Sequence, residues 1–379
     1  MDQFQYFSYA QEVIFGSDAL FRLSAAVERL ACQRVIICAS RSIRVNGHLA
    51  LIENALGERV VAVFDQVRPH VQDTQVREIL ALALEKKVDA VIGMGGGSPV
   101  GMAKALAAAL EEKQPASSIR QRIPVIAIPT TYAGSEMTAV YGVTHTDENP
   151  TRKVTVTDPR IVPALVVYVP MLTLDLPAEL TASTGINALA HCIEALYSKT
   201  RNPLSTAAAI SGLRYIFNSL LRCYQDGNNL EARSEMLLGA HLAGLSLASV
   251  SMGLHHGLCH VLGGSANIPH GIANSIILPH AIRFNAQATA AQLLPVADLL
   301  GIPVSAGSPR TAVEAVGQKI DELIGQMNLP QRLRDAGVPL QQSDLPKLAQ
   351  LGFQNRSVQN NPRPVTDAAQ IEKLLSEAW

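Results

Sequence analysis

The chain has 379 residues, well above the size of a single globular core, so we expect two domains. Its 31 Lys and Arg residues nearly balance its 32 Asp and Glu residues, which leaves a net charge of -1 and no overall field to attract nucleic acid. Hydrophobic residues make up 48% and charged residues 17%, which favours buried cores over disorder. The composition predicts a compact globular protein and excludes polyanion binding as a leading function.

Targeting and redox signals point to a cytoplasmic protein. No apolar run reaches the roughly 20 residues that span a bilayer, so we expect no membrane partner. The segment Met1-Asp2-Gln3-Phe4 lacks the basic and apolar regions of a signal peptide. The five cysteines are scattered and form no C-x-x-C pair, so neither a disulfide framework nor a thiolate zinc site is predicted.

The first 160 or so residues alternate short β-branched runs with helical stretches. The strand-like runs are residues 34–38, 59–64, 90–93 and 124–128. Residues 74–87 have apolar side chains at helical spacing. This alternation predicts a parallel, doubly wound sheet.

After about residue 163 the composition changes to long stretches rich in Ala and Leu, such as residues 205–221 and 231–248. Residues 166–169 form one last strand-like run close to the change. We therefore predict an α/β dinucleotide-binding domain over residues 1–162 and an all-helical substrate domain over residues 163–379.

A glycine-rich turn follows the third strand-like run. It comprises Gly95, Gly96, Gly97 and Ser98, followed by Pro99. Glycines let backbone N–H groups approach a phosphate, Ser98 suits an N-cap, and Pro99 suits the first helical position. Such a turn also occurs for steric reasons alone, and it matches neither G-x-G-x-x-G nor the P-loop pattern. Both interpretations stay open.

The next loop, residues 129–138, is dense in hydroxyl groups, among them Thr130, Thr131 and Ser135. It leaves the carboxyl edge of the predicted sheet, where parallel sheets bind ligands. The alternative is a polar turn with capping hydroxyls.

Histidines gather in two places in the second half. Asn187 and His191 lie four residues apart in a predicted helix over residues 183–197, with Ser183 or Thr184 as its cap. His256 and His260 are also four apart, and His270 follows shortly after. Three histidines and an amide could hold a divalent cation, but they leave its charge uncompensated. The alternative is a pocket without metal in which imidazoles donate hydrogen bonds or a proton.

Together these segments resemble the iron-containing alcohol dehydrogenase superfamily, and within it the maleylacetate reductases. The resemblance rests on the glycine turn, on residues 129–138, 185–191, 201–204 and 254–260, and on Asn361-Pro362-Arg363-Pro364. It implies a nucleotide-binding α/β domain, an all-helical domain of the dehydroquinate synthase-like fold, and a cleft between them where NADH or NADPH exchanges hydride with substrate. It also implies a homodimer.

By motif position, Asn187, His191, His256 and His270 stand where iron-dependent members carry one Asp and three His ligands. His260 matches a further histidine, and Lys153 matches a lysine near the nicotinamide. Asn in place of Asp is typical of the maleylacetate reductases, which are regarded as working without metal. The resemblance thus implies reduction of maleylacetate to 3-oxoadipate in bacterial breakdown of aromatic compounds.

Two features differ from those reductases. Gly257 stands where they usually have Lys, and Gly271-Ile272-Ala273-Asn274 is similar to metal-dependent alcohol dehydrogenases. The alternative function is therefore an Fe- or Zn-dependent alcohol dehydrogenase acting on a small alcohol or aldehyde, with Asn187, His191, His256 and His270 as ligands. A third hypothesis is a nucleotide-binding protein without catalysis.

Cofactor and substrate contacts complete the prediction. Ser40 and Arg41 follow the first strand-like run, where NAD-selective relatives place an Asp, so NADPH should be accepted as well as NADH. The glycine turn would hold the pyrophosphate, and Thr130, Thr131 and Ser135 the nicotinamide side. Lys153 and Arg363 are the predicted partners of the carboxylates of a small oxo-dicarboxylate. The alternative for Arg41 is a side chain that points to solvent, and the alternative for Arg363 is a surface ion pair.

Overall fold

The computed structural model describes residues 3–114, 121–145, 152–304 and 308–379. It consists of two compact units, one spanning Ser8–Leu176 and the other joining Met1–Phe7 to Pro177–Trp379. The division thus falls after Leu176 instead of after residue 162. The reason is the strand β8 (Leu165–Tyr168), which completes the sheet before the chain leaves the α/β unit.

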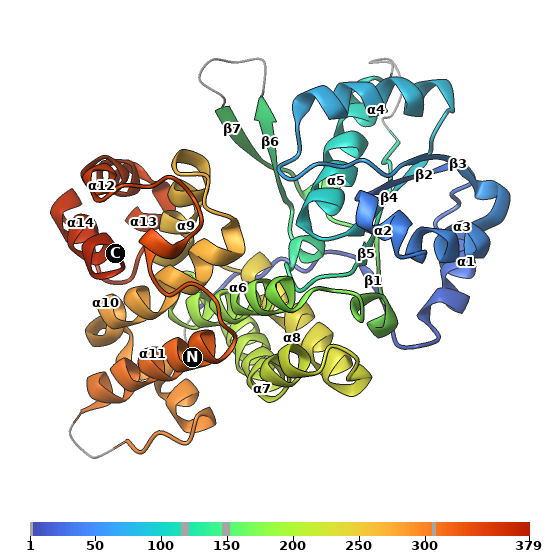
Figure 1. The fold of residues 1–379 in the computed structure, drawn as a ribbon. Coiled ribbons are helices and arrows are strands. Elements are labelled where there is room, and N and C mark those ends of the chain that lie inside the picture. The colour runs from blue at the N-terminus through green and yellow to red at the C-terminus, as the bar shows by residue number, and fades with distance from the viewer. Residues whose placement is uncertain (1–2, 115–120, 146–151, 305–307) are drawn as a thin grey trace. The chain divides into compact units, whose positions relative to one another are not determined.

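The first unit is built on a parallel six-stranded sheet in the order β1-β8-β5-β4-β2-β3 (Figure 1). Its strands coincide with the β-branched runs of the sequence, since branched side chains pack well on a pleated surface. The other five strands are β1 (Glu12–Phe15), β2 (Val35–Ala39), β3 (Val60–Phe64), β4 (Ala90–Gly95) and β5 (Val125–Pro129). The predicted doubly wound α/β fold is confirmed.

Helices cover both faces of this sheet. Ile37 of β2 belongs to one core with Leu23 and Ile52, whereas Ile36 points to the other face and belongs to a core with Ile79. The helices of the first face are α1 (Ala19–Arg29), α2 (Arg41–Val45) and α3 (His48–Leu56), and those of the second are α4 (Asp73–Glu85) and α5 (Gly97–Glu112). An antiparallel pair, β6 (Val140–His145) and β7 (Arg152–Thr157), was not predicted.

The second unit contains helices and no strand within its described residues. Gly185 allows two of them to approach closely, because a Cβ there would lie 2.2 Å from Cδ1 of Leu220. No helix in the described ranges combines the length and apolar character needed to cross a membrane. The helices are α6 (Ala178–Tyr197), α7 (Pro203–Gln225), α8 (Leu230–Ala248), α9 (Leu254–Ser265), α10 (His270–Leu299), α11 (Pro309–Gln326), α12 (Leu345–Gln354), α13 (Arg356–Gln359) and α14 (Ala368–Glu377).

Candidate functional site

The carboxyl ends of three neighbouring strands bring most of the predicted cofactor residues to one edge of the sheet. β2 lies beside β4, and β4 beside β5, so the segments after these strands begin side by side. The chain leaves β2 toward β3 but leaves β4 toward β5, and ligands bind to parallel sheets where the strand order reverses in this way. The residues gathered here are Ser40, Arg41, Gly95, Gly96, Gly97, Ser98, Thr130 and Thr131.

The first two glycines of the turn have steric reasons of their own. Gly95 has a φ of +136°, which side chains rarely tolerate. A Cβ on Gly96 would lie 3.1 Å from Cγ2 of Thr131. Gly95 therefore needs glycine whether or not a ligand binds, and a side chain at position 96 would require Thr131 to shift by a few tenths of an ångström.

Gly97 differs, because a Cβ there would meet only the Cβ of Ala133 at 3.9 Å. Space is therefore left beside the first turn of α5, where N–H groups have no acceptor within the helix and the dipole favours an anion. The prediction that Ser98 caps this helix and Pro99 opens it is wrong. The helix begins at Gly97 with Gly96 as its N-cap, and it has no side-chain cap.

Lys104 fixes the loop that contains Ser135. Its Nζ is fully buried and donates hydrogen bonds to the backbone oxygens of Ser135 (2.6 Å), Thr138 (2.7 Å) and Val140 (3.1 Å). Burial lowers the pKa of Lys104 to about 7, and the nearby Glu136 raises it. Sequence reasoning missed this residue, although a lysine inside the apolar run of α5 was a signal.

Two arginines after β2 differ in their contacts. Arg44 forms an ion pair with Asp65, beyond the end of β3. Arg41 is exposed and makes no hydrogen bond or ion pair within the described ranges. Its guanidinium is therefore available to a ligand. Lys153 lies in β7 opposite Thr144, and its side chain lies outside the described residues.

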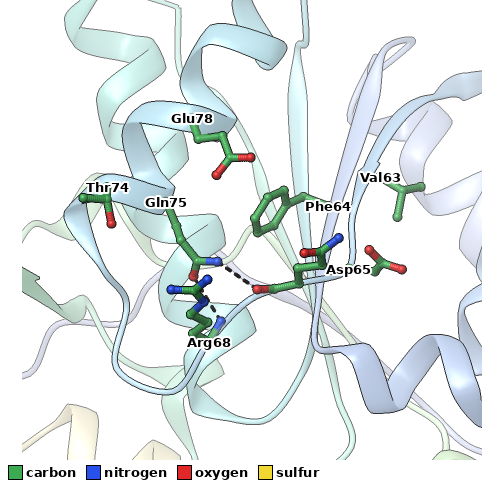
Figure 2. A pocket seen from close by; sticks show the side chains of 8 residues that line it. Val63, Phe64, Asp65, Arg68, Thr74, Gln75 and Glu78 are labelled. Atoms are coloured by element: carbon green, nitrogen blue, oxygen red, sulfur yellow. Dashed lines mark hydrogen bonds between the residues drawn. The ribbon is translucent and has the colours of Figure 1, made fainter.

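A polar hollow of about 410 Å³ lies beyond β3, and none of the predicted site residues lines it. Figure 2 shows the amide of Gln75 bridging its wall: the amide nitrogen donates to the carbonyl oxygen of Gln66 (2.8 Å) and the amide oxygen accepts from the N–H of Arg68 (3.0 Å). These two hydrogen bonds join the loop between β3 and α4 to the first turns of α4.

In the second unit, three helices bring four predicted histidines together. His191 comes from α6, His256 and His260 from α9, and His270 begins α10. The ring centroids of His191 and His256 are 4.7 Å apart, those of His256 and His270 are 6.0 Å apart, and those of His260 and His270 are 5.8 Å apart. Asn187 lies one turn before His191 on α6 and is 5% exposed.

Burial keeps most of this cluster neutral. Burial, and secondarily His260, lowers the pKa of His256 to about 3. Burial also holds the pKa of His191 and of His270 well below the usual range, with smaller contributions from neighbouring histidines. His260 is exposed. These histidines thus combine buried neutral rings with one ring open to solvent.

Glu194 is the residue of this cluster that sequence reasoning missed. It is 1% exposed, and its Oε2 lies 2.6 Å from Nδ1 of His256. Burial raises the pKa of this carboxyl group, and hydrogen bonds from its neighbours oppose the rise. The signal was its spacing: it follows Asn187 by seven residues and His191 by three, which places all three on one face of α6.

The cluster fits a divalent cation better than its sequence predicts. Nδ1 of His191 and Nε2 of His256 are buried without a hydrogen-bond partner. Glu194 adds a negative charge beside His256, and such a carboxylate behind a histidine is usual in metal centres. The objection that the four candidate ligands are all neutral therefore loses part of its force.

A second group, Glu194, His255 and His256, also has ligand atoms within 4.8 Å of one another. Its nitrogens are already engaged, however. Nδ1 of His256 contacts Glu194, and Nε2 of His255 lies 3.2 Å from the carbonyl oxygen of Asn274. This group supports the rings of the cluster instead of facing a ligand.

The remaining predicted residues have structural contacts. Arg363 donates from Nη1 to the carbonyl oxygen of Phe284 (2.7 Å), and its guanidinium carbon lies 4.0 Å from the centroid of that ring. Ser183 and Thr184 do not cap α6, which begins at Ala178, so that prediction is wrong. At Gly257 a Cβ would lie 2.6 Å from Cγ2 of Val358, which leaves no room for the Lys of the reductases without movement of α13.

Comparison with known proteins agrees with both units. The iron-containing alcohol dehydrogenase model matches residues 10–170, and the C-terminal model of the Fe-containing alcohol dehydrogenase family matches residues 181–379. A maleylacetate reductase of Pseudomonas knackmussii is 35% identical over 97% of this chain and 95% of its own length. One of Burkholderia cepacia is 34% identical over 100% and 98%.

Solved structures include both reductases and alcohol dehydrogenases. Maleylacetate reductase from Agrobacterium tumefaciens has a TM-score of 0.85 and 31% identity, covering 100% of this chain and 99% of its own. A 1,3-propanediol oxidoreductase has a TM-score of 0.92 and 29% identity, covering 100% of both chains.

Proposed function

This chain belongs to the iron-containing alcohol dehydrogenase family and is an oxidoreductase, and on that premise we propose that it reduces maleylacetate to 3-oxoadipate with NADH or NADPH. Curated relatives named maleylacetate reductase match it over nearly its full length. The observation that carries the proposal is the cluster of histidines, most of them buried and neutral, with Asn187 beside it in place of a carboxylate. The hypothesis of a nucleotide-binding protein without catalysis is set aside, because the relatives are enzymes.

The edge of the sheet is the proposed cofactor site. A bound nicotinamide supplies the hydride. We assign the pyrophosphate to the first turn of α5 beside Gly97, and the nicotinamide side to Thr130, Thr131 and Ser135. Arg41, with Ser40, would face the adenosine ribose, where a guanidinium and no carboxylate would accept a 2′-phosphate.

The histidine cluster is the proposed substrate site. When hydride adds to the electron-poor carbon, the electron pair of the double bond moves toward the carbonyl oxygen. We propose that His191, His256, His260, His270 and Asn187 surround that oxygen, and that the groups among them with a hydrogen to donate stabilise its charge. A proton then completes the product, so that one hydride and one proton are added in all.

The dicarboxylate needs cations nearby. Lys153 is the proposed partner of one carboxylate. Arg363 was the predicted partner of the other carboxylate, but its contacts with Phe284 favour a structural role for it.

We propose that the reaction needs no metal, because Asn187 is neutral and would not compensate the charge of a bound cation. The second candidate function is a metal-dependent alcohol dehydrogenase. It is favoured by the two unpartnered ring nitrogens of His191 and His256 and by the carboxylate of Glu194. In that function His191, His256, His270 and Asn187 would hold Fe²⁺ or Zn²⁺, which would polarise the substrate oxygen.

One experiment separates the two candidates. The protein is chelated exhaustively, its metal content is measured, and oxidation of NADH and NADPH is followed with maleylacetate and with small aldehydes. We expect turnover of maleylacetate without metal. Activity that vanishes and returns with Fe²⁺ or Zn²⁺ would reject the metal-free reaction, and activity on aldehydes alone would reject the substrate. Light scattering on the same sample tests the proposed homodimer.

A further inference from the structure

The positions of the protons in the cluster follow from the partners of its ring nitrogens. Nε2 of His255 lies 3.2 Å from the carbonyl oxygen of Asn274, which can only accept, so this nitrogen carries a hydrogen. In the neutral ring Nδ1 of His255 is then a lone pair, and it lies 3.2 Å from Nδ1 of His256. His255 is fully buried, and burial disfavours a charged ring.

Glu194 meets donors on every side. Its Oε1 accepts from the N–H of Gly253 (3.1 Å), the N–H of His255 (3.2 Å) and the hydroxyl of Tyr197 (3.2 Å), and its Oε2 accepts from the N–H of His256 (3.3 Å). These donors occupy acceptor positions on both carboxyl oxygens, which opposes a proton there. The lone pair on Nδ1 of His255 also requires a hydrogen on Nδ1 of His256 opposite it. The hydrogen in its 2.6 Å contact with His256 therefore belongs to Nδ1 of the ring.

We propose that Glu194 is a positioning residue that fixes His256 in its Nδ1–H tautomer. Both neighbours of that nitrogen, Oε2 of Glu194 and Nδ1 of His255, are acceptors. Nε2 of His256 is left as a lone pair, buried and without a partner. It can accept a hydrogen bond from a substrate hydroxyl or bind a cation, but the neutral ring has no proton there to give.

This tautomer gives the histidines different roles in the proposed reduction. The role of His256 is to accept, and the proton that completes 3-oxoadipate comes from the solvent side, where His260 is exposed. Only this division rests on the proposed function. The tautomer itself follows from the hydrogen bonds and can be tested without substrate.

Glu194 also holds the first turn of α9, so a test must separate that structural role from its effect on the ring. Asn361 supplies the matched control. Its Oδ1 accepts from the N–H of Leu254, the first residue of the same helix, at 3.2 Å. It is equally buried, and within the part of the chain that the structure describes its side chain bonds to Asn285 and to the backbone, with no histidine ring among its partners.

The test is long-range ¹H–¹⁵N NMR of the chelated full chain labelled at histidine, with the His256 signals assigned by their loss in His256→Gln. We expect a protonated Nδ1 and a pyridine-type Nε2 in the wild type. In Glu194→Gln the amide can donate as well as accept, so we expect a large population of the Nε2–H tautomer. Asn361→Ala should melt at a lower temperature and keep the wild-type tautomer.

Zn²⁺ affinity, measured by competition with a chelator, provides a second readout. We expect about a 10- to 100-fold loss in Glu194→Gln, as for other carboxylates behind a ligand histidine, and no such loss in Asn361→Ala. Glu194→Asp keeps the charge and serves if Glu194→Gln does not fold; we expect it to keep the Nδ1–H tautomer. An Nε2–H tautomer in the wild type, or an unchanged tautomer in Glu194→Gln, would overturn the proposal. Failure to reduce maleylacetate would leave it intact.

Discussion

The proposed cofactor site at the edge of the sheet and the proposed substrate site at the histidine cluster are built in opposite ways. At the edge, side chains are left out: Gly97 opens space beside backbone N–H groups at the start of α5. In the cluster, titratable rings are crowded together and kept neutral by burial. The first arrangement suits an anion that arrives with its own charge. The second suits charge that develops during a reaction, because neutral groups can respond to it.

The largest effect is expected at His256, in the histidine cluster. His256→Ala should lower kcat about 10²- to 10⁴-fold, the usual contribution of a positioned catalytic group. Binding of NADH should not change, because the sheet edge is untouched. Stopped-flow turnover and fluorescence titration of NADH measure the two effects. His280→Ala, which removes a histidine of α10 paired with Arg283, is the control and should keep kcat. Normal kcat in His256→Ala would refute this role.

The sheet edge is tested through the support of its loop. Lys104→Met leaves three buried carbonyl oxygens without their donor, and we expect a loss of about 3 kcal/mol in the free energy of unfolding. Urea denaturation measures it. Lys113→Met, at the exposed end of the same helix, should change stability little. Equal losses in the two variants would show that the buried hydrogen bonds do not stabilise the loop.

Gly97→Val sharpens the comparison, because it separates a phosphate site from a merely close-packed turn. The Cβ has room, so we expect an unchanged melting temperature. The side chain would occupy the space proposed for the pyrophosphate, and we expect cofactor affinity to fall at least about tenfold, or 1.4 kcal/mol. Calorimetric titration with NADH and NADPH tests this. Unchanged affinity would favour the steric explanation of the turn. Gly264→Val, at an open glycine of α9, is the control.

The neutral histidines predict a loss of stability in acid. The pKa of His255 is about 3 in the folded chain and about 6.5 as a reference, so between these values the unfolded state binds more protons. The free energy of unfolding therefore falls as pH drops from about 6.5 toward 3, by about 1.4 kcal/mol per unit for such a histidine. Urea denaturation at pH 7 and pH 5 measures the slope. His255→Gln should reduce it, and an equal slope would contradict the prediction.

The sequence predicts the strands of the first unit better than it predicts where the helices of the second unit begin. Strands such as β2 and β5 follow directly from β-branched runs, and the glycine turn from its place after a strand. The start of α6 could not be placed, because Ser183 has the chemistry of a cap but lies inside a helix that begins at Ala178. Apolar periodicity continues across such a residue, and only packing decides where the helix starts.

The charged residues that support each site were hidden for a different reason. Glu194 contacts His256 from 62 residues away, and the acceptors of Lys104 are backbone oxygens 31 to 36 residues along the chain. Spacing along a helix shows that such a residue faces the core. It does not show which atoms lie opposite, and those atoms decide whether a buried charge orients a ring or fixes a loop.

Transfer of deuterium from NADH labelled on its transferable C4 position tests the central claim most directly. The account predicts that maleylacetate yields 3-oxoadipate with one deuterium bound to carbon, for the chelated protein as for the untreated one, by mass spectrometry. Product without deuterium, or label found only in an alcohol formed from an added aldehyde, would contradict it.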